Sequence, residues 1–236
     1  MEAGWMGTLI FLAELLGVAA FSVSGALLGV ERRLDLFGIV LLGVTTSVGG
    51  GALRDIVLGS FPPMMFRNPI YTFLAFLFSL LVFFVVWRTG GYDEIQKSKI
   101  SGIINLFDAI GLGIFSVTGV STAISAGYLD NAFLCVFVGT LTGIGGGILR
   151  DMMSGAIPAV LHKHIYAVAA IAGAMSYYWL LRFGVPDFVA VPVGVVLTLG
   201  IRLLAARFRW SLPKATYEQR AEQARWRAIW KEEEKR

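Results

Sequence analysis

Seven long apolar stretches constrain the fold of this 236-residue chain more than any other feature of its sequence. They cover residues 8–30, 36–59, 69–87, 103–126, 131–155, 165–183 and 188–205. A helix of about 20 apolar residues crosses the roughly 30 Å of hydrocarbon in a membrane. The strands of a membrane barrel would instead show short segments of alternating hydrophobicity. We therefore predict an all-α integral membrane protein with seven transmembrane helices in a single membrane domain, residues 1–205.

The placement of the basic residues predicts how this domain is oriented. Seven spans would place Arg32, Arg33, Arg88, Lys97, Lys99, Lys163 and a basic tail at 206–236 on one side of the membrane. The other side would receive only Arg67 and Arg182. Since cytoplasmic loops carry an excess of Lys and Arg, we expect the N-terminus outside and the C-terminus in the cytoplasm. The tail suits anionic membrane lipids better than nucleic acid, and its charge pattern is equally typical of a solvated helix.

The two halves of the membrane domain repeat one another. GGGALRD at residues 49–55 recurs as GGGILRD at 145–151, and FSVSG at 21–25 recurs as FSVTG at 115–119. The copies cover about 8–87 and about 103–183, with three spans each, and the seventh helix at about 188–205 lies outside them. Because three is an odd number, the second copy enters the membrane from the opposite face. This pattern predicts an inverted-topology repeat.

Each repeat carries a glycine triplet: Gly49, Gly50 and Gly51 in the second span, and Gly145, Gly146 and Gly147 in the fifth. Glycine costs about 1 kcal/mol relative to alanine inside a helix, so we predict kinked and broken helices 2 and 5. Backbone groups released in lipid need a protein partner or water. Nearby hydroxyls would supply such partners or line a wet path, namely those of Thr45, Thr46, Ser47, Thr140 and Thr142.

Close helix packing is the alternative role for these glycines. It is the commonest use of glycine in membrane helices, and we favour it for Gly25, Gly29, Gly139 and Gly143. For the triplets we favour the break, because one glycine suffices for close contact and the triplet is duplicated beside charged residues.

Six ionisable residues lie inside or near the ends of the predicted spans: Glu14, Arg54, Asp55, Asp108, Arg150 and Asp151. A charge at the membrane centre costs about 2.5–3.5 kcal/mol, so each should be paired or face water. Sequence neighbours in a helix point to different sides. We therefore expect Arg54 to pair with a carboxylate of the first or fourth helix or of the other repeat, and not with Asp55. Such pairs would narrow or gate a polar path. The alternative is that the arginines only anchor helix ends at the membrane boundary.

Sequence motifs of enzymes and metal sites are missing from the chain. No phosphate-binding loop follows the glycines, and no Ser, His and Asp share a plausible face. His162 and His164 are two positions apart and would not share a helix face. We expect no enzymatic activity, no cofactor, and no metal beyond permeant monovalent cations.

The paired GGGxLRD motifs, the FSVSG and FSVTG segments and the seven-span layout resemble prokaryotic members of the trimeric intracellular cation channel family. The same sequences are also grouped as a bacterial domain family labelled glycine transporter. The resemblance implies a homotrimer in the plasma (inner) membrane of a prokaryote. It also implies a pore for K+ or Na+ within each protomer, with K+ favoured, constricted where the kinked second and fifth helices meet at the triplets. Animal members bind an inositol lipid, but they carry a different charged motif at one kink, so lipid gating is not implied here.

Two functions are compatible with these patterns. The first is a potassium-permeable channel, and the second is a secondary transporter of a small zwitterion such as glycine, because inverted repeats with broken helices also build transporters. A lining of hydroxyl and backbone groups, without a clear substrate pocket, favours the channel.

Overall fold

A computed structural model describes residues 2–89, 97–162, 165–208 and 210 of the chain. In chain order its helices are α1 (Glu2–Glu31), α2 (Leu36–Val57), α3 (Met64–Arg67), α4 (Ile70–Arg88), α5 (Lys97–Ala123), the π-helical turn η2 (Ile124–Tyr128), α6 (Ala132–Met153), α7 (Ala159–His162), α8 (Tyr166–Arg182) and α9 (Asp187–Phe208). No strand occurs within the described ranges. The prediction of an all-α protein is confirmed, whereas residues 211–236 of the predicted tail lie outside the described residues.

Six helices are long and apolar enough to cross a membrane: Gly7–Glu31, Leu36–Val57, Ile70–Arg88, Ile100–Tyr128, Ala132–Met153 and Asp187–Phe208. Large apolar side chains such as Leu16, Phe73 and Val196 are exposed on their outer faces, while polar side chains such as Thr46 and Thr142 are buried. Apolar residues outside and polar ones inside are what a protein in lipid requires. The predicted sixth span corresponds to α8, which has only 17 residues. The described helices thus support six spans, one fewer than predicted.

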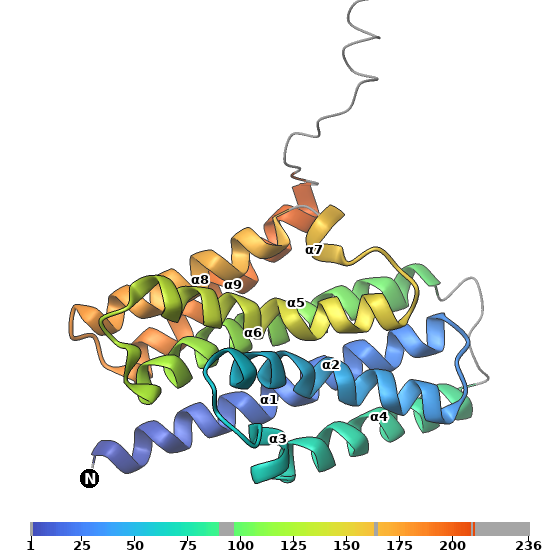
Figure 1. Cartoon of the computed structure of the whole chain (residues 1–236). Helices are drawn as coiled ribbons and strands as arrows, with labels where there is room; N and C mark the ends of the chain where they lie inside the picture. The colour runs from blue at the N-terminus through green and yellow to red at the C-terminus, as the bar shows by residue number, and fades with distance from the viewer. Residues whose placement is uncertain (1, 90–96, 163–164, 209, 211–236) are drawn as a thin grey trace, which may run out of the picture.

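The core contains two equivalent groups of helices that face each other (Figure 1). α1 packs on α2 and α4, and α5 packs in the same way on α6 and α8. Between the groups, α1 contacts α5 and α2 contacts α6, while α9 packs against α8 and α5. α1 runs from left to right in Figure 1 and α5 runs back from right to left. Equivalent helices of the two groups are therefore antiparallel.

The ends of α2 and α6 are built alike. Each helix is followed by a glycine with positive φ, Gly59 at 66° and Gly155 at 70°, a conformation that glycine adopts without steric penalty. The next residue donates its backbone N–H back into the helix, from Ser60 to the carbonyl of Asp55 at 2.8 Å and from Ala156 to that of Asp151 at 2.9 Å. These turns end both helices soon after the charged pairs and lead into the short helices α3 and α7.

The prediction that the glycine triplets break their helices is wrong. α2 and α6 continue as α-helix through Gly49–51 and Gly145–147, and no residue inside either helix has a non-helical backbone. The physical reason is packing. A Cβ atom on Gly50 would meet the carbonyl oxygen of Thr142, and one on Gly146 would meet that of Thr46. Dispersion contacts between closely approaching backbones thus offset the low helix propensity of glycine.

The packing role favoured for the other glycines is confirmed. A Cβ atom on Gly25 would lie 2.7 Å from the carbonyl oxygen of Leu42, and one on Gly139 would lie 2.5 Å from that of Ser116. These contacts hold α1 against α2 and α5 against α6. Glycine therefore brings the helices together within each half as well as between the halves.

Candidate functional site

The two glycine triplets form the crossing of α2 and α6. A Cβ on Gly49 would meet the side chain of Leu149, and one on Gly145 would meet that of Leu53. The first glycine of each triplet therefore faces a residue that follows the other triplet, so α2 and α6 cross in opposite directions. As a result, the Arg–Asp pairs that follow the triplets lie on opposite sides of the crossing.

The predicted hydroxyls lie at this crossing and bond chiefly within their own helices, although Ser47 also donates to the carbonyl of Val18 in α1 at 3.2 Å. Thr46 donates to the carbonyl of Leu42 at 2.5 Å, and Thr142 donates to that of Val138 at 2.6 Å. Ser47 and Thr140 make the same kind of bond, to the carbonyls of Gly43 and Val136, and Thr45 is half-buried. Because the helices are unbroken, these hydroxyls do not replace lost backbone partners. Ser47 does line a cavity beside the crossing.

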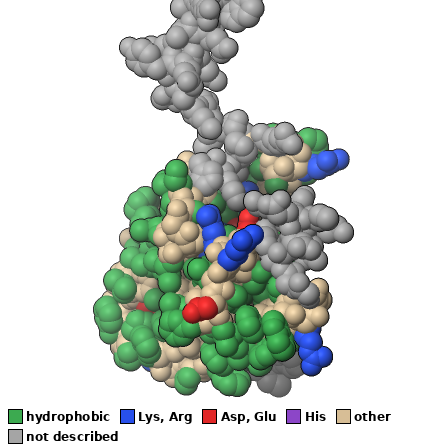
Figure 2. All heavy atoms as spheres, turned by 90° about the vertical axis from the view of Figure 1, so that its right-hand side faces the viewer, with side chains coloured by type: hydrophobic (Ala, Val, Ile, Leu, Met, Phe, Trp, Pro, Cys, Tyr) green, Lys and Arg blue, Asp and Glu red, His purple; other side chains and the backbone are tan. Residues whose placement is uncertain are grey.

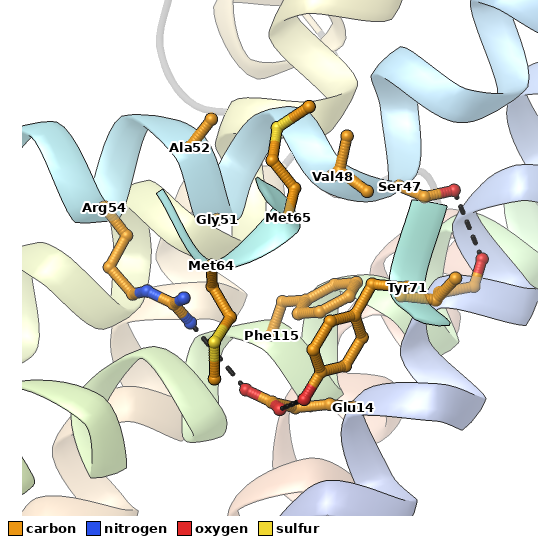
Figure 3. A pocket seen from close by; sticks show the side chains of 11 residues that line it. Glu14, Ser47, Val48, Gly51, Ala52, Arg54, Met64, Met65, Tyr71 and Phe115 are labelled. Carbon is orange, nitrogen blue, oxygen red and sulfur yellow. Dashed lines mark hydrogen bonds and ion pairs between the residues drawn. The ribbon is translucent and has the colours of Figure 1, made fainter. Parts of the chain in front are cut away.

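On one side of the crossing lies a cavity of about 40 Å³, here called cavity one (Figure 3). Its polar wall is formed by Glu14 of α1, Arg54 of α2 and Tyr71 of α4. The Tyr71 hydroxyl donates to Glu14 Oε2 at 2.6 Å, and Arg54 Nη1 lies 3.7 Å from Glu14 Oε1. Arg54 Nη1 also donates to Thr122 Oγ1 of α5 at 3.3 Å. Arg54 thus pairs with a carboxylate of the first helix, as predicted, and also contacts a hydroxyl of the other repeat.

Contrary to the prediction, Arg54 also pairs with its neighbour Asp55, through Nε and Oδ1 at 2.9 Å. The two side chains leave the helix in different directions, but the arginine side chain is long enough to fold back along the helix end. The second oxygen of Asp55 accepts the backbone N–H of Met64 at 2.6 Å, at the start of α3. Asp55 therefore joins the charged pair to the short helix that follows.

On the other side of the crossing, Arg150 makes the equivalent contacts at shorter range. Its Nη1 lies 2.7 Å from Asp108 Oδ1 and 2.8 Å from Ser24 Oγ, which belongs to α1. Its Nε lies 2.9 Å from Asp151 Oδ1, and Asp151 Oδ2 accepts the backbone N–H of Ala159 at 2.7 Å, where α7 begins. Asp108 belongs to α5, the fourth predicted span, so Arg150 has a partner of the kind expected for Arg54, and it too pairs with its sequence neighbour.

These groups border a larger cavity of about 240 Å³, here called cavity two, which Arg150 shares with Asp108, Asp151, Arg202 and Arg32. Cavity two lies near the end of the molecule seen in Figure 2, where basic and acidic side chains stand among apolar ones. Both cavities thus combine carboxylates with arginines. Neither is lined only by apolar side chains, so each can hold water or an ion.

Several residues around the charged pairs were not among the predicted site residues. Tyr71, Ser24 and Thr122 contact the charged pairs, and Arg202 of α9 lies with its guanidinium carbon 4.8 Å from the ring centroid of Tyr166. Tyr71 and Tyr166 occupy matching places in the two repeats, which was the available signal. Arg202 is 5% exposed, and its position near the end of an apolar span gave no indication of burial.

Comparison with known proteins identifies relatives over most of the chain. The family model described as glycine transporter matches residues 11–87 and 105–182, which fall within the two predicted repeats. A UPF0126 membrane protein of Deinococcus radiodurans is 40% identical over 202 residues, 85% of this chain and 89% of the relative. The inner membrane protein YadS of Escherichia coli is 36% identical over 209 residues, 87% of this chain and 95% of the relative.

Solved structures share the fold. A TRIC trimeric intracellular cation channel orthologue from Rhodobacter sphaeroides has a TM-score of 0.76 and 31% identity, and the match covers 85% of this chain and 98% of that one. A prokaryotic TRIC channel also has a TM-score of 0.76, with 33% identity, 87% of this chain and 99% of that one covered. The resemblance expected from the motifs is confirmed. This chain belongs to the family of bacterial membrane proteins that the glycine transporter model describes, a family that shares its fold with the TRIC cation channels.

Proposed function

We propose that this protein is a channel for monovalent cations, with K+ favoured over Na+, and that it assembles as a homotrimer with an ion path inside each protomer. One solved structure with this fold is named a trimeric intracellular cation channel orthologue and another a prokaryotic TRIC channel, and the match to each covers at least 85% of this chain. Inversion of the two halves would make the path pseudo-symmetric, with one half opening to each side of the membrane.

The observation that carries the proposal is the pair of cavities on opposite sides of the α2–α6 crossing. Cavity one contains the carboxylate of Glu14, which attracts cations, and Arg54, which limits this attraction. In cavity two the carboxylates of Glu31, Asp108 and Asp151 are balanced by Arg32, Arg150 and Arg202. Carboxylates and backbone carbonyls are the groups that cation channels use along their paths. We place the constriction at the triplets, where the carbonyls of Thr46 and Thr142 lie against the opposite helix.

We expect purified protein in planar bilayers to give single-channel currents whose reversal potential follows the K+ gradient. The physical reason is that the carboxylates favour cations over anions in both cavities. Uptake of labelled glycine into proteoliposomes, measured on the same preparation, is expected to equal that of empty vesicles. Saturable glycine uptake without unitary currents would contradict the channel and favour a transporter.

The orientation in the membrane is part of the proposal. We take α8 as a seventh span, because 17 residues at 1.5 Å each extend about 26 Å, close to the thickness of the hydrocarbon. Arg32, Arg33 and Arg88 would then face the cytoplasm together with the C-terminus.

Reporter fusions test this orientation in the membrane of a bacterial host. Alkaline phosphatase, which is active only outside the cytoplasm, is expected to be active when fused at the N-terminus and inactive after Arg236. A fluorescent protein that folds only in the cytoplasm should give the reverse pattern. The same pattern at both ends would exclude seven spans.

A further inference from the structure

Two phenylalanines occupy matching places in the two halves, in the FSVSG and FSVTG segments. Phe21 of α1 is 1% exposed and Phe115 of α5 is 7% exposed. Their ring centroids lie 5.3 Å apart, with 32° between the ring planes. The pair therefore stands where the two halves of the molecule meet, with one ring contributed by each half.

Each ring occupies space that a glycine of the opposite helix leaves free. A Cβ atom on Gly111 of α5 would meet the ring of Phe21, and a Cβ atom on Gly17 of α1 would lie 3.1 Å from the ring of Phe115. Gly17 and Gly111 are equivalent in the two repeats. The spaces that accommodate the two rings are thus related by the repeat, as the two phenylalanines themselves are.

The aromatic pair lies between the two cavities. Gly17, under the Phe115 ring, is about one helical turn from Glu14 of cavity one, and Gly111, under the Phe21 ring, is about one turn from Asp108 of cavity two. Figure 3 shows the Phe115 ring in the wall of cavity one. A Cβ on Gly146 would lie 3.4 Å from the Phe21 ring, so that ring also borders the α2–α6 crossing.

We propose that Phe21 and Phe115 form the hydrophobic gate of the ion path, and that cations pass only when the two rings move apart. This inference rests on the proposed channel function. Apolar constrictions close pores because they exclude water, and an ion without water or polar ligands does not cross them. The neighbouring hydroxyls offer no substitute at this point, since Ser22 and Ser116 donate to the carbonyls of Ala19 and Leu112 in their own helices.

The gate is tested by recording currents from wild type, Phe21→Ala and Phe115→Ala in bilayers. Each substitution removes one ring and should raise the mean current per channel by roughly tenfold, equivalent to lowering a barrier by about 1.4 kcal/mol. Because the rings are equivalent, both variants should respond by similar factors. Phe133→Ala is the matched control: Phe133 also stacks on a second ring, Phe137, but it is 80% exposed on the outer face of α6. Its current should equal that of wild type.

Folding of each variant is checked by gel filtration and thermal unfolding, because both rings belong to a buried apolar cluster. If the alanine variants do not fold, Phe21→Leu and Phe115→Leu decide the question, with an expected rise of about twofold from the smaller side chain. If the folded variants carry the same mean current as wild type, the gate is overturned, whereas the proposed channel function is unaffected. Absence of cation current from wild type and from every folded variant would overturn the channel and the gate together.

Discussion

Replacing Arg150 with alanine is expected to destabilise the folded protein by about 3–5 kcal/mol, because the change leaves buried carboxylates without their cation. Asp108 is 2% exposed and would lose its partner at 2.7 Å. Asp151 would keep the backbone N–H of Ala159 but lose the guanidinium. Denaturant unfolding in detergent, followed by tryptophan fluorescence, measures the change in free energy.

Two companion variants separate this effect from a general loss of charge. Asp108→Asn in the Arg150→Ala background removes the orphaned carboxylate and should restore part of the lost stability. Arg182→Ala breaks an exposed pair, since Arg182 lies 2.9 Å from Asp130 with side chains that are 46% and 88% exposed. That change should cost less than about 1 kcal/mol. A loss for Arg150→Ala as small as that for Arg182→Ala would contradict the pairing described here.

The equivalent pair on the other side should be weaker. Arg54 Nη1 lies 3.7 Å from Glu14 Oε1, and Glu14 keeps a hydrogen bond from Tyr71 when the arginine is removed. The two sides of the crossing therefore differ in how firmly their charges are held, although their sequences repeat. Along the proposed path, the arginine would therefore be held more firmly at Asp108 than at Glu14.

Much of this arrangement could be predicted from the sequence. Apolar length located six of the seven predicted spans, and the helix predicted at 36–59 is observed as Leu36–Val57. The repeat made Glu14 and Asp108 candidates for the same role, and both contact the arginine of their own repeat. These predictions succeeded because they depend on the chain locally or on its internal symmetry.

The predictions that failed did so because they took no account of contacts made in the folded protein. Helix propensity predicted a break at the triplets, but propensity describes an isolated helix and takes no account of the opposite backbone. Neighbouring side chains leave a helix in different directions, which argued against an Arg54–Asp55 contact. The arginine side chain is nevertheless long enough to reach Asp55. Arg202 comes from the helix outside the repeat, so no symmetry argument could place it beside Arg150 in cavity two.

The second large effect is expected from the middle glycine of each triplet. Gly50→Ala places a methyl group against the carbonyl oxygen of Thr142, and Gly146→Ala does the same against Thr46. Backbone atoms cannot rotate away as a side chain can, so α2 and α6 must separate. Overpacking of this kind costs about 1–3 kcal/mol and sometimes more. We expect each variant to lose at least this much stability in denaturant unfolding, and the double variant to fail to fold.

Gly51→Ala provides the control within the same triplet. A Cβ there would have only Arg54 Nη2 nearby, at 3.8 Å, so the variant should gain up to about 1 kcal/mol from the better helix propensity of alanine. If the triplets acted as helix breaks, alanine at any of their positions would straighten the helix, and Gly50→Ala would be as stable as Gly51→Ala. If they bring two backbones together, the intolerant position is the one whose Cβ would meet the backbone of the other helix, which is Gly50 and not Gly51. A stability difference between these two single-methyl variants, in the direction stated, therefore identifies backbone contact as the reason that glycine stands at the crossing.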